Sequence, residues 1–309
     1  MRVISFGGGV QSTALAILAA QRKIKVDAFV FCDTGFEQSI VFEFLDQHTK
    51  PLLDKAGVPF YTAKTQDYAG QLHGKSTFAN WILPPFFHKS LEKINYIKKR
   101  EYLCNCENSE LLMVDNYEFE HKNDCEFIEE SDADFYERTI NFRQQSNAVG
   151  RQPAYCSSKW KADVFKRFCA SKFNSKKYDV IMGFSTDEMN RSARMKSTKK
   201  YTYQFPLLDL RMNRGDCVKL VQDTFNAPPP RSSCYFCPNH TQHEWRKVME
   251  SADRQKVIDI DKLIRQSVND DLKDVNMYLT AECKPIAECE FDDKNEVIFS
   301  RLCSGGCFL

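Results

Sequence analysis

A glycine run near the start of the chain, in MRVISFGGGVQSTALAILAA, has the residue types of an anion site. Residues 3–6 predict a short buried strand, and residues 11–20 predict a helix that packs against a sheet. The glycines between them can turn their backbone N–H groups toward one point, and the helix adds free N–H groups and the positive end of its dipole. We therefore expect a phosphate-binding loop. The alternative is a glycine-rich turn that binds no ligand.

Two common phosphate-binding loops do not match this stretch. SFGGGVQST lacks both the spacing and the lysine of the Walker loop, and it lacks the spacing G-x-G-x-x-G of dinucleotide-binding proteins. A glycine run flanked by Ser5, Ser12 and Thr13 remains, and such a loop would hold phosphate through backbone N–H groups without a lysine.

A second group of reactive side chains lies in CYFCPNH, where Cys234, Cys237 and His240 have the spacing C-x2-C-x2-H. Thiolates and an imidazole this close in sequence can share one metal ion. The alternative is that the cysteines are buried and pack as small hydrophobic residues.

The composition excludes several classes of protein. Lys and Arg total 43 against 42 for Asp and Glu in 309 residues, so the net charge of +1 gives no overall attraction to nucleic acids or acidic membranes, and any such binding must be local. No run of about 18 apolar residues occurs, and the N-terminus leads directly into a strand. We therefore expect a cytoplasmic protein with neither a transmembrane helix nor a signal peptide. In that compartment the 13 cysteines favour metal, cluster or nucleophile roles over disulfides.

Apolar strands and amphipathic helices alternate along the chain, which predicts an α/β fold with a Rossmann-like parallel sheet and helices on both faces. Ligands of such sheets bind beyond the carboxyl ends of the strands, where the glycine loop and Asp33 of VDAFVFCDTGFE fall. The further elements we expect are helices at 38–56, 159–173 and 213–225, and strands at 58–61 and 178–183.

Two segments interrupt this alternation. Between about 76 and 150 the sequence is aromatic, charged and irregular, with ten acids and one lysine from Asp115 to Glu137. We interpret it as an insertion or lid, with a solvated loop as the alternative. The prolines of APPPRSSCYFCPNH then predict a boundary between a nucleotide-binding domain, residues 1–227, and a smaller cysteine-containing helical part, residues 228–309.

Five further stretches follow the glycine loop in order: FCDTGFE, RQPAYCSSKWK, GFSTDEMNR, FPLLDLRMNRGDC and RSSCYFCPNHTQHEW. Together they resemble the phosphoadenosine phosphosulfate (PAPS) reductase-like branch of the PP-loop ATP pyrophosphatases, the adenine nucleotide alpha-hydrolase group. The glycine loop itself resembles the SGGxxS loop with which that group grips the pyrophosphate of ATP. The resemblance covers roughly residues 1–65 and 150–250.

The resemblance implies two phosphate-proximal loops, the glycine loop and the loop after the strand at 178–183. The residues implied at the nucleotide are Ser5, Gly7, Gly8, Gly9, Gln11, Ser12, Thr13, Gly183, Asp187, Glu188 and Arg191. Asp33 would lie near the nucleotide too and could hold Mg²⁺ on the phosphates, or it could cap a turn. Arg191 opens RSARMKSTKK, which has five basic residues and no acid. Such a run is either a solvated face or a contact to phosphate or sulfate, and Arg214 is a weaker candidate of the same kind.

The intact loop favours ATP over PAPS. True PAPS reductases, as a family, have a loop degraded from the SGGxxS form, because they have no β,γ-pyrophosphate to bind, whereas this chain keeps the glycines and Ser12. We expect cleavage of ATP between the α and β phosphates, a reaction that backbone N–H groups, Mg²⁺ and arginines suffice to catalyse.

A cysteine upstream of a C-x2-C pair is similar to the arrangement that holds the [4Fe–4S] cluster in adenylyl-sulfate reductases. There the upstream element is a cysteine pair, whereas here it is Cys156 followed by Ser157. For the fourth ligand we expect Cys217 first and His240 second. Four thiolates favour an iron–sulfur cluster or Zn²⁺, and three thiolates with one histidine favour Zn²⁺.

The remaining cysteines lie in the insertion and the tail. Cys307 of SRLCSGGCFL resembles the catalytic cysteine on the C-terminal segment of PAPS reductases, although the surrounding motif differs; the alternative is that Cys303 and Cys307 pack or ligate the metal. Cys104, Cys106 and Cys125 are expected to be free thiols, because C-x-C is poor zinc spacing.

These features favour an enzyme that binds ATP or a related adenylyl nucleotide for sulfur transfer or adenylation, with a nucleic acid, a small thiol or a carrier protein as acceptor. One alternative is a PAPS or adenylyl-sulfate reductase. Another is a non-catalytic nucleotide-binding module with a structural zinc, in which the basic stretches at 93–100 and 191–200 dock RNA or DNA.

Overall fold

The computed structural model describes most of the chain: residues 1–64, 84–101, 136–151, 154, 156–266 and 277–291. The acidic run up to residue 135 lies outside these residues. So do the cysteines of the insertion and the tail, Cys104, Cys106, Cys125, Cys303 and Cys307, for which the sequence predictions stand as they were made.

Five parallel strands form the central sheet: β1 (Arg2–Phe6), β2 (Ala28–Asp33), β3 (Phe60–Lys64), β6 (Tyr178–Ile181) and β7 (Tyr201–Gln204). Their order is β3-β2-β1-β6-β7, so the chain first builds outward from β1 to one side and later returns to build from β1 to the other. In open α/β sheets the ligand site lies at this reversal, beyond the carboxyl ends of the two strands that flank it, here β1 and β6. The prediction of a Rossmann-like parallel sheet is confirmed.

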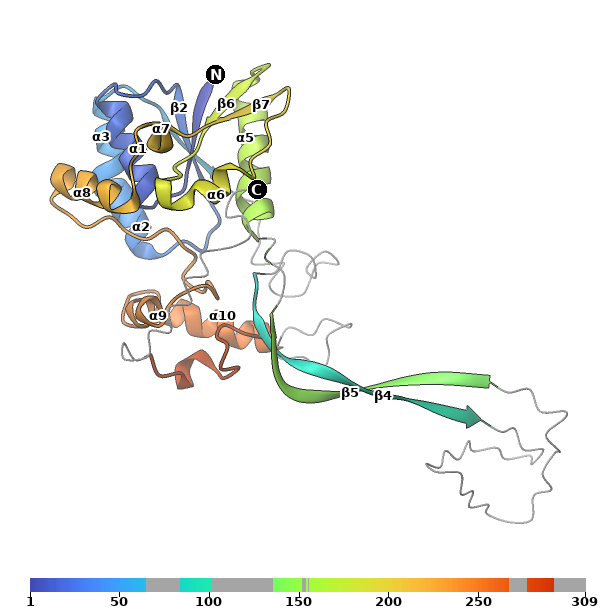
Figure 1. The fold of residues 1–309 in the computed structure, drawn as a ribbon. Helices are drawn as coiled ribbons and strands as arrows, with labels where there is room; N and C mark the ends of the chain where they lie inside the picture. The colour runs from blue at the N-terminus through green and yellow to red at the C-terminus, as the bar shows by residue number, and fades with distance from the viewer. Residues whose placement is uncertain (65–83, 102–135, 152–153, 155, 267–276, 292–309) are drawn as a thin grey trace, which may run out of the picture. The chain divides into compact units, whose positions relative to one another are not determined.

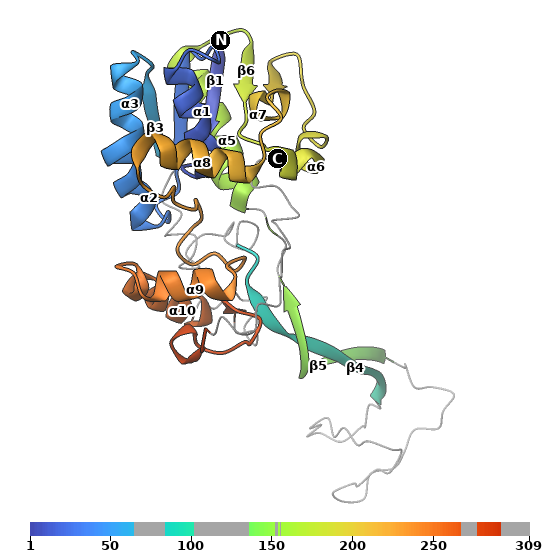
Figure 2. The same ribbon diagram turned by 60° about the vertical axis from the view of Figure 1, so that its left-hand side comes forward.

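Helices cover both faces of the sheet (Figures 1 and 2). One apolar core joins Ile4 and Phe6 of β1 to side chains of α1 (Val10–Ala20), α3 (Lys50–Lys55) and α8 (Arg214–Phe225). A second core lies on the opposite face, where Val3 of β1 packs with α5 (Asp163–Phe173). This alternation of side chains along β1 places Ser5 on the α5 face, away from α1.

The helix boundaries follow from local chemistry. The predicted helix at 38–56 is α2 (Ser39–Phe44), a π-helical segment (Leu45–Thr49) and α3 in succession. A second π-helical segment, Ser157–Ala162, leads into α5. Helix α8 begins with a capping box, because Asn213 Oδ1 accepts from Asp216 N at 2.9 Å and Asp216 Oδ2 accepts from Asn213 N at 2.9 Å. Sequence reasoning missed the short elements β7, α6 (Met189–Ser192) and α7 (Pro206–Asp209).

Residues beyond 228 contribute α9 (Gln242–Met249), α10 (Arg254–Gln266), β8 (Met277–Tyr278) and a 3-10 turn at Ile286–Glu288. Their core also includes Phe36, Phe86 and Trp160 from earlier parts of the chain. Residues 1–88 and 150–309 form one compact unit, so the domain boundary at 227/228 stays a prediction.

Sequence analysis assigned no secondary structure to the insertion, and its described residues are regular. They form two long strands, β4 (Phe87–Glu101) and β5 (Tyr136–Arg151), which are neighbours in a small sheet of order β5-β4-β8. Residues 89–149 make up a second compact unit. Within the described part of the chain, no helix combines the length and the apolar character that crossing a bilayer requires.

Candidate functional site

The glycine loop joins β1 to α1 in a shape that only glycine permits at its centre. Gly8 has φ +79°, and a Cβ there would lie 2.8 Å from Val41 Cγ1 and 3.3 Å from Phe31 Cε2. Gly9 is extended, but a Cβ there would come within 3.2 Å of Ser232 Cβ. The loop therefore runs closely between the start of α2 and the segment around Ser232.

Two hydroxyl groups of α1 stabilise the loop. Ser12 Oγ accepts from Gly9 N at 3.0 Å, and Thr13 Oγ1 donates to Gly9 O at 2.9 Å. Both side chains are buried. The first turn of α1 starts at Val10, and the first N–H groups of a helix have no acceptor within it. With the positive end of the helix dipole, they make this turn a favourable position for phosphate.

The loop after β6 lies against the first turn of α1. A Cβ on Gly183 would be 3.2 Å from both Gln11 C and Ser12 N, and Gln11 Nε2 donates to Glu188 Oε2 at 3.2 Å. The structure thus brings together the two loops that the resemblance implied. Both leave the sheet at the carboxyl ends of β1 and β6, where the strand order reverses.

Acidic side chains hold this second loop in place. Arg191 forms an ion pair with Glu188, and its guanidinium lies 4.6 Å from the ring centroid of Phe184. Asp187 Oδ2 accepts from Ser185 Oγ at 3.2 Å and from Arg214 N at 2.6 Å, which ties the loop to the N-terminus of α8. Asp187 and Glu188 therefore organise the loop, and Glu188 holds Arg191 while it also accepts from Gln11 of α1.

Two predicted nucleotide contacts have other surroundings. Ser5 lines a small cavity on the α5 face with Lys166 and Met182, so its side chain does not face α1 as a phosphate contact of that helix would. Asp33 Oδ1 accepts from Gly35 N at 2.8 Å, so the turn-capping role that was the alternative is confirmed. A role of Asp33 in Mg²⁺ binding stays a prediction.

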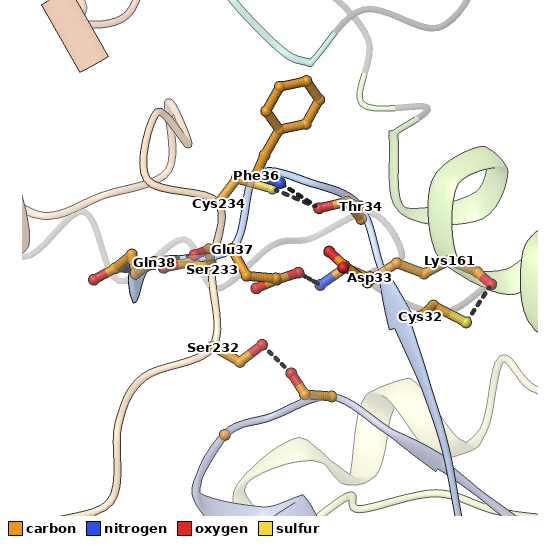
Figure 3. Close-up of polar contacts among 12 residues, drawn as sticks. Cys32, Asp33, Thr34, Phe36, Glu37, Gln38, Lys161, Ser232, Ser233 and Cys234 are labelled. Carbon is orange, nitrogen blue, oxygen red and sulfur yellow. Dashed lines mark hydrogen bonds and ion pairs between the residues drawn. The ribbon is translucent and has the colours of Figure 1, made fainter. Parts of the chain in front are cut away.

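The segment with the C-x2-C motif passes beside the glycine loop, as Figure 3 shows. Ser232 Oγ donates to Gly7 O, and Gln38 Nε2 donates to Ser233 Oγ at 2.8 Å. Cys234 forms an antiparallel bridge with Glu37, and Tyr235 N donates to Phe36 O at 2.9 Å. These contacts place the cysteines next to the residues that follow β2.

Three of the predicted metal ligands lie in one neighbourhood. Burial raises the pKa of the Cys234 thiol well above its ordinary value, and the charges of Glu37, Cys237 and Cys156 add to this, whereas Lys161 lowers it. Cys237 N donates to Cys234 O at 3.0 Å, which closes the turn between these two cysteines. As their side chains stand, however, no three Cys, His, Asp or Glu of the described residues have the arrangement of a metal cage.

Of the two candidates for the fourth ligand, Cys217 lies elsewhere, and His240 lies beside the C-x2-C turn. Cys217 is buried in the core shared by α1 and α8, and burial raises its pKa to about 11; the structure does not bring it to the other cysteines. His240 Nε2 is 2.9 Å from Cys234 O, so this nitrogen is a donor to the C-x2-C turn. Burial lowers the pKa of His240 to about 4, which keeps the ring neutral. His240 therefore stabilises the turn through Nε2, while Nδ1 has no hydrogen-bond partner among the described residues, so its role as a metal ligand stays a prediction.

Sequence reasoning missed a buried ion pair beside Cys234. Lys161 Nζ lies 2.7 Å from Glu37 Oε1, the Glu37 side chain is fully buried, and Lys161 is 15% exposed (Figure 3). Glu37 Oε2 has no hydrogen-bond partner among the described residues. Both residues fall in stretches that carry the resemblance, FCDTGFE and CSSKWK, but nothing in their spacing indicates that they pair.

Comparisons of the chain with family models, curated proteins and solved structures gave no match.

Proposed function

We propose that the chain is an enzyme of the PP-loop ATP pyrophosphatase type, in the adenine nucleotide alpha-hydrolase group, that binds ATP at the glycine loop. It would activate an acceptor by cleaving the nucleotide between the α and β phosphates, for adenylation or for transfer of sulfur. The fold supports this at the coarser level of a Rossmann-like sheet with an anion-binding turn after its first strand.

One observation carries the proposal. The glycine loop and the loop after β6 contact one another, through Gly183 and Gln11, at the position in the sheet where α/β proteins bind nucleotides. A glycine-rich turn that served only to connect β1 to α1 would not need a second loop that packs against its helix and also carries an arginine held by an ion pair.

Each group of the site has a place in the reaction. The N–H groups at the start of α1 would bind the pyrophosphate, and Arg191 and Arg214 would stabilise the charge that develops on it. Asp33 would hold Mg²⁺ on the phosphates. The acceptor's nucleophile bonds to the α-phosphorus as the bond to the bridging oxygen breaks, and the electron pair leaves with pyrophosphate.

The neighbouring thiols favour sulfur chemistry among the possible outcomes. Cys156, Cys234 and Cys237 would hold Zn²⁺ or an iron–sulfur cluster, since thiolates suit both. A cluster would supply electrons or bind sulfur, and Zn²⁺ would stabilise the fold. His240 and the Glu37–Lys161 pair position this cysteine segment. The catalytic role of Cys307 stays part of the proposal.

Calorimetry and product analysis test the proposal. Mg·ATP should bind the full chain, and Ser12→Ala should weaken binding about tenfold, because loss of the Ser12–Gly9 hydrogen bond loosens the loop. Ser171→Ala is a matched control, since Ser171 Oγ donates to Phe168 O on α5. Turnover should release pyrophosphate, with the adenylyl group recovered as AMP or on the acceptor. Absence of ATP binding, or release of ADP and phosphate, would contradict the proposal, and sulfite from PAPS would establish the reductase instead.

A further inference from the structure

Positive charge is concentrated in two segments that flank β6 and β7. Residues 164–178 and 191–204 together contain ten basic residues and no acid, in a chain whose net charge is only +1. Lys166 and Arg191 are half-buried. The other eight basic residues are exposed: Arg167, Lys172, Lys176, Lys177, Arg194, Lys196, Lys199 and Lys200. Lys172 lies apart from the others, because its Nζ is 5.5 Å from the ring centroid of Tyr61 on β3, at the other end of the sheet order. We call the remaining seven exposed residues, with Lys166, the basic strip.

The structure joins the two segments into one surface. Tyr178 N donates to Lys200 O at 2.8 Å, and Tyr178 is in register with Tyr201, so Lys177 and Lys200 lie at the start of adjacent strands. Lys166 of α5 approaches the same place, with Nζ 5.9 Å from the ring centroid of Tyr201. Strand β7 is at the end of the sheet order, with α5 on the face behind it (Figure 1).

Two acids border these segments, of which one is paired with a lysine outside them and one is a carboxylate on β6 beside β7. Asp163 pairs with Lys159 at 3.2 Å, and Asp179 accepts a hydrogen bond from Thr202. Charged side chains such as lysine protect a sheet edge from pairing with another strand. Eight basic residues with one bordering carboxylate exceed that need, and they form the kind of surface to which a polyanion binds.

Aromatic rings lie within the basic strip. Tyr201 and Tyr203 are half-buried, and both line a cavity with Lys166 and Phe165. The Nζ atoms of Lys166 and Lys200 each lie 5.9 Å from the ring centroid of Tyr201, whose ring also stacks on that of Tyr178 with the centroids 5.4 Å apart. Cationic side chains around partly exposed rings suit a single-stranded nucleic acid, whose phosphates the lysines neutralise and whose unpaired bases stack on the rings.

We infer that the basic strip binds single-stranded nucleic acid, with Tyr201 and Tyr203 as stacking positions. The segment at 191–204 begins with Arg191, whose partner Glu188 contacts α1, so a strand on this surface leads toward the glycine loop. Only the further step, that the bound strand is the acceptor, rests on the proposed function.

Fluorescence anisotropy with a labelled oligouridylate of about 15 nucleotides, without ATP, tests the inference on the full chain. The variant Lys176→Glu/Lys177→Glu/Lys199→Glu should bind at least tenfold more weakly at about 100 mM salt. The slope of log affinity against log salt should fall by about 2, since each phosphate contact of a single strand contributes about 0.7. The neutral set Lys176→Gln/Lys177→Gln/Lys199→Gln should show a smaller loss in the same direction.

The control is Lys219→Glu/Lys247→Glu/Lys262→Glu, which makes the same change of net charge at exposed lysines on α8, α9 and α10 and should leave affinity within about threefold of the parent. Tyr201→Ala should weaken binding, and Tyr201→Phe should keep it. Equal losses in strip and control variants would overturn the inference. So would tighter binding of a duplex of the same length, binding to anionic vesicles without binding to the oligonucleotide, or no binding at about 50 mM salt. Because ATP is absent, none of these results depends on the proposed reaction.

Discussion

Removal of the lysine from the buried Glu37–Lys161 pair tests how the cysteine segment is held. Lys161→Met leaves the Glu37 carboxylate buried without its counter-ion, which lies 2.7 Å away in the parent. At an effective dielectric constant of about 20 the attraction at this distance is about 6 kcal/mol, and truncation of one partner of a buried pair typically costs about 3–5 kcal/mol. Because Lys161 is 15% exposed, we expect a loss near the lower end, about 3 kcal/mol.

Urea unfolding of four proteins measures this effect: the parent, Lys161→Met, Glu37→Gln and the double variant. The double variant should be more stable than the sum of the single losses predicts, because it has no unpaired charge. Lys159→Met is the matched control. Its partner Asp163 lies 3.2 Å away, but the two side chains are 54% and 45% exposed, so the expected loss is below about 1 kcal/mol. Equal losses at Lys161 and Lys159, or strict additivity in the double variant, would refute the reasoning.

Three further perturbations test the surroundings of the site. Gly8→Ala should destabilise the fold more than Gly57→Ala. Both glycines have positive φ, which strains an alanine by about 1–2 kcal/mol, but only at Gly8 would the new Cβ lie 2.8 Å from Val41. Equal melting temperatures of the two variants would contradict this. Asn213→Ala should cost about 1 kcal/mol through loss of the capping box, and an unchanged urea midpoint would show that the cap contributes nothing. Burial lowers the pKa of His240 from 6.5 to about 4, so between these values the unfolded state binds a proton that the folded state does not. The free energy of unfolding should therefore decrease by about 3 kcal/mol as the pH falls from 7 to 4, and His240→Gln should reduce this dependence. Equal pH profiles of the parent and His240→Gln would contradict the burial of a neutral ring.

The sequence predicted most of the sheet because a buried strand can be recognised from its own residues. Val3, Ile4 and Phe6, like the run from Ala28 to Cys32, are buried on both faces and appear as continuous apolar stretches. Tyr201–Gln204 was missed because this four-residue strand alternates tyrosine with polar residues and follows a basic run. The long strands β4 and β5 were missed because their charged sequence lacks the apolar pattern of a buried strand.

The sequence predicted those parts of the site where the backbone conformation requires a particular residue type. It predicted less well the parts that depend on contacts between residues far apart in the chain. Gly8 and Ser12 have the positions expected from the loop pattern. Cys217 was expected at the metal site because the upstream element has one cysteine where a pair was needed, but as a small apolar side chain it packs between two helices. The Glu37–Lys161 pair joins residues far apart in the chain, and no local pattern indicates such a contact.

Amide shifts on addition of Mg·ATP test the central claim most directly. In a transverse-relaxation-optimised ¹H–¹⁵N spectrum of the deuterated chain, phosphate bound by backbone N–H groups shifts the signals of the amides that hold it. We predict the largest shifts at residues 7–12 of the glycine loop and at 183–191 of the loop after β6, with little change at Gly57, which lies in the turn between α3 and β3. Binding of ATP that leaves residues 7–12 unshifted, or no shifts at millimolar ATP, would contradict the claim that this loop holds the nucleotide.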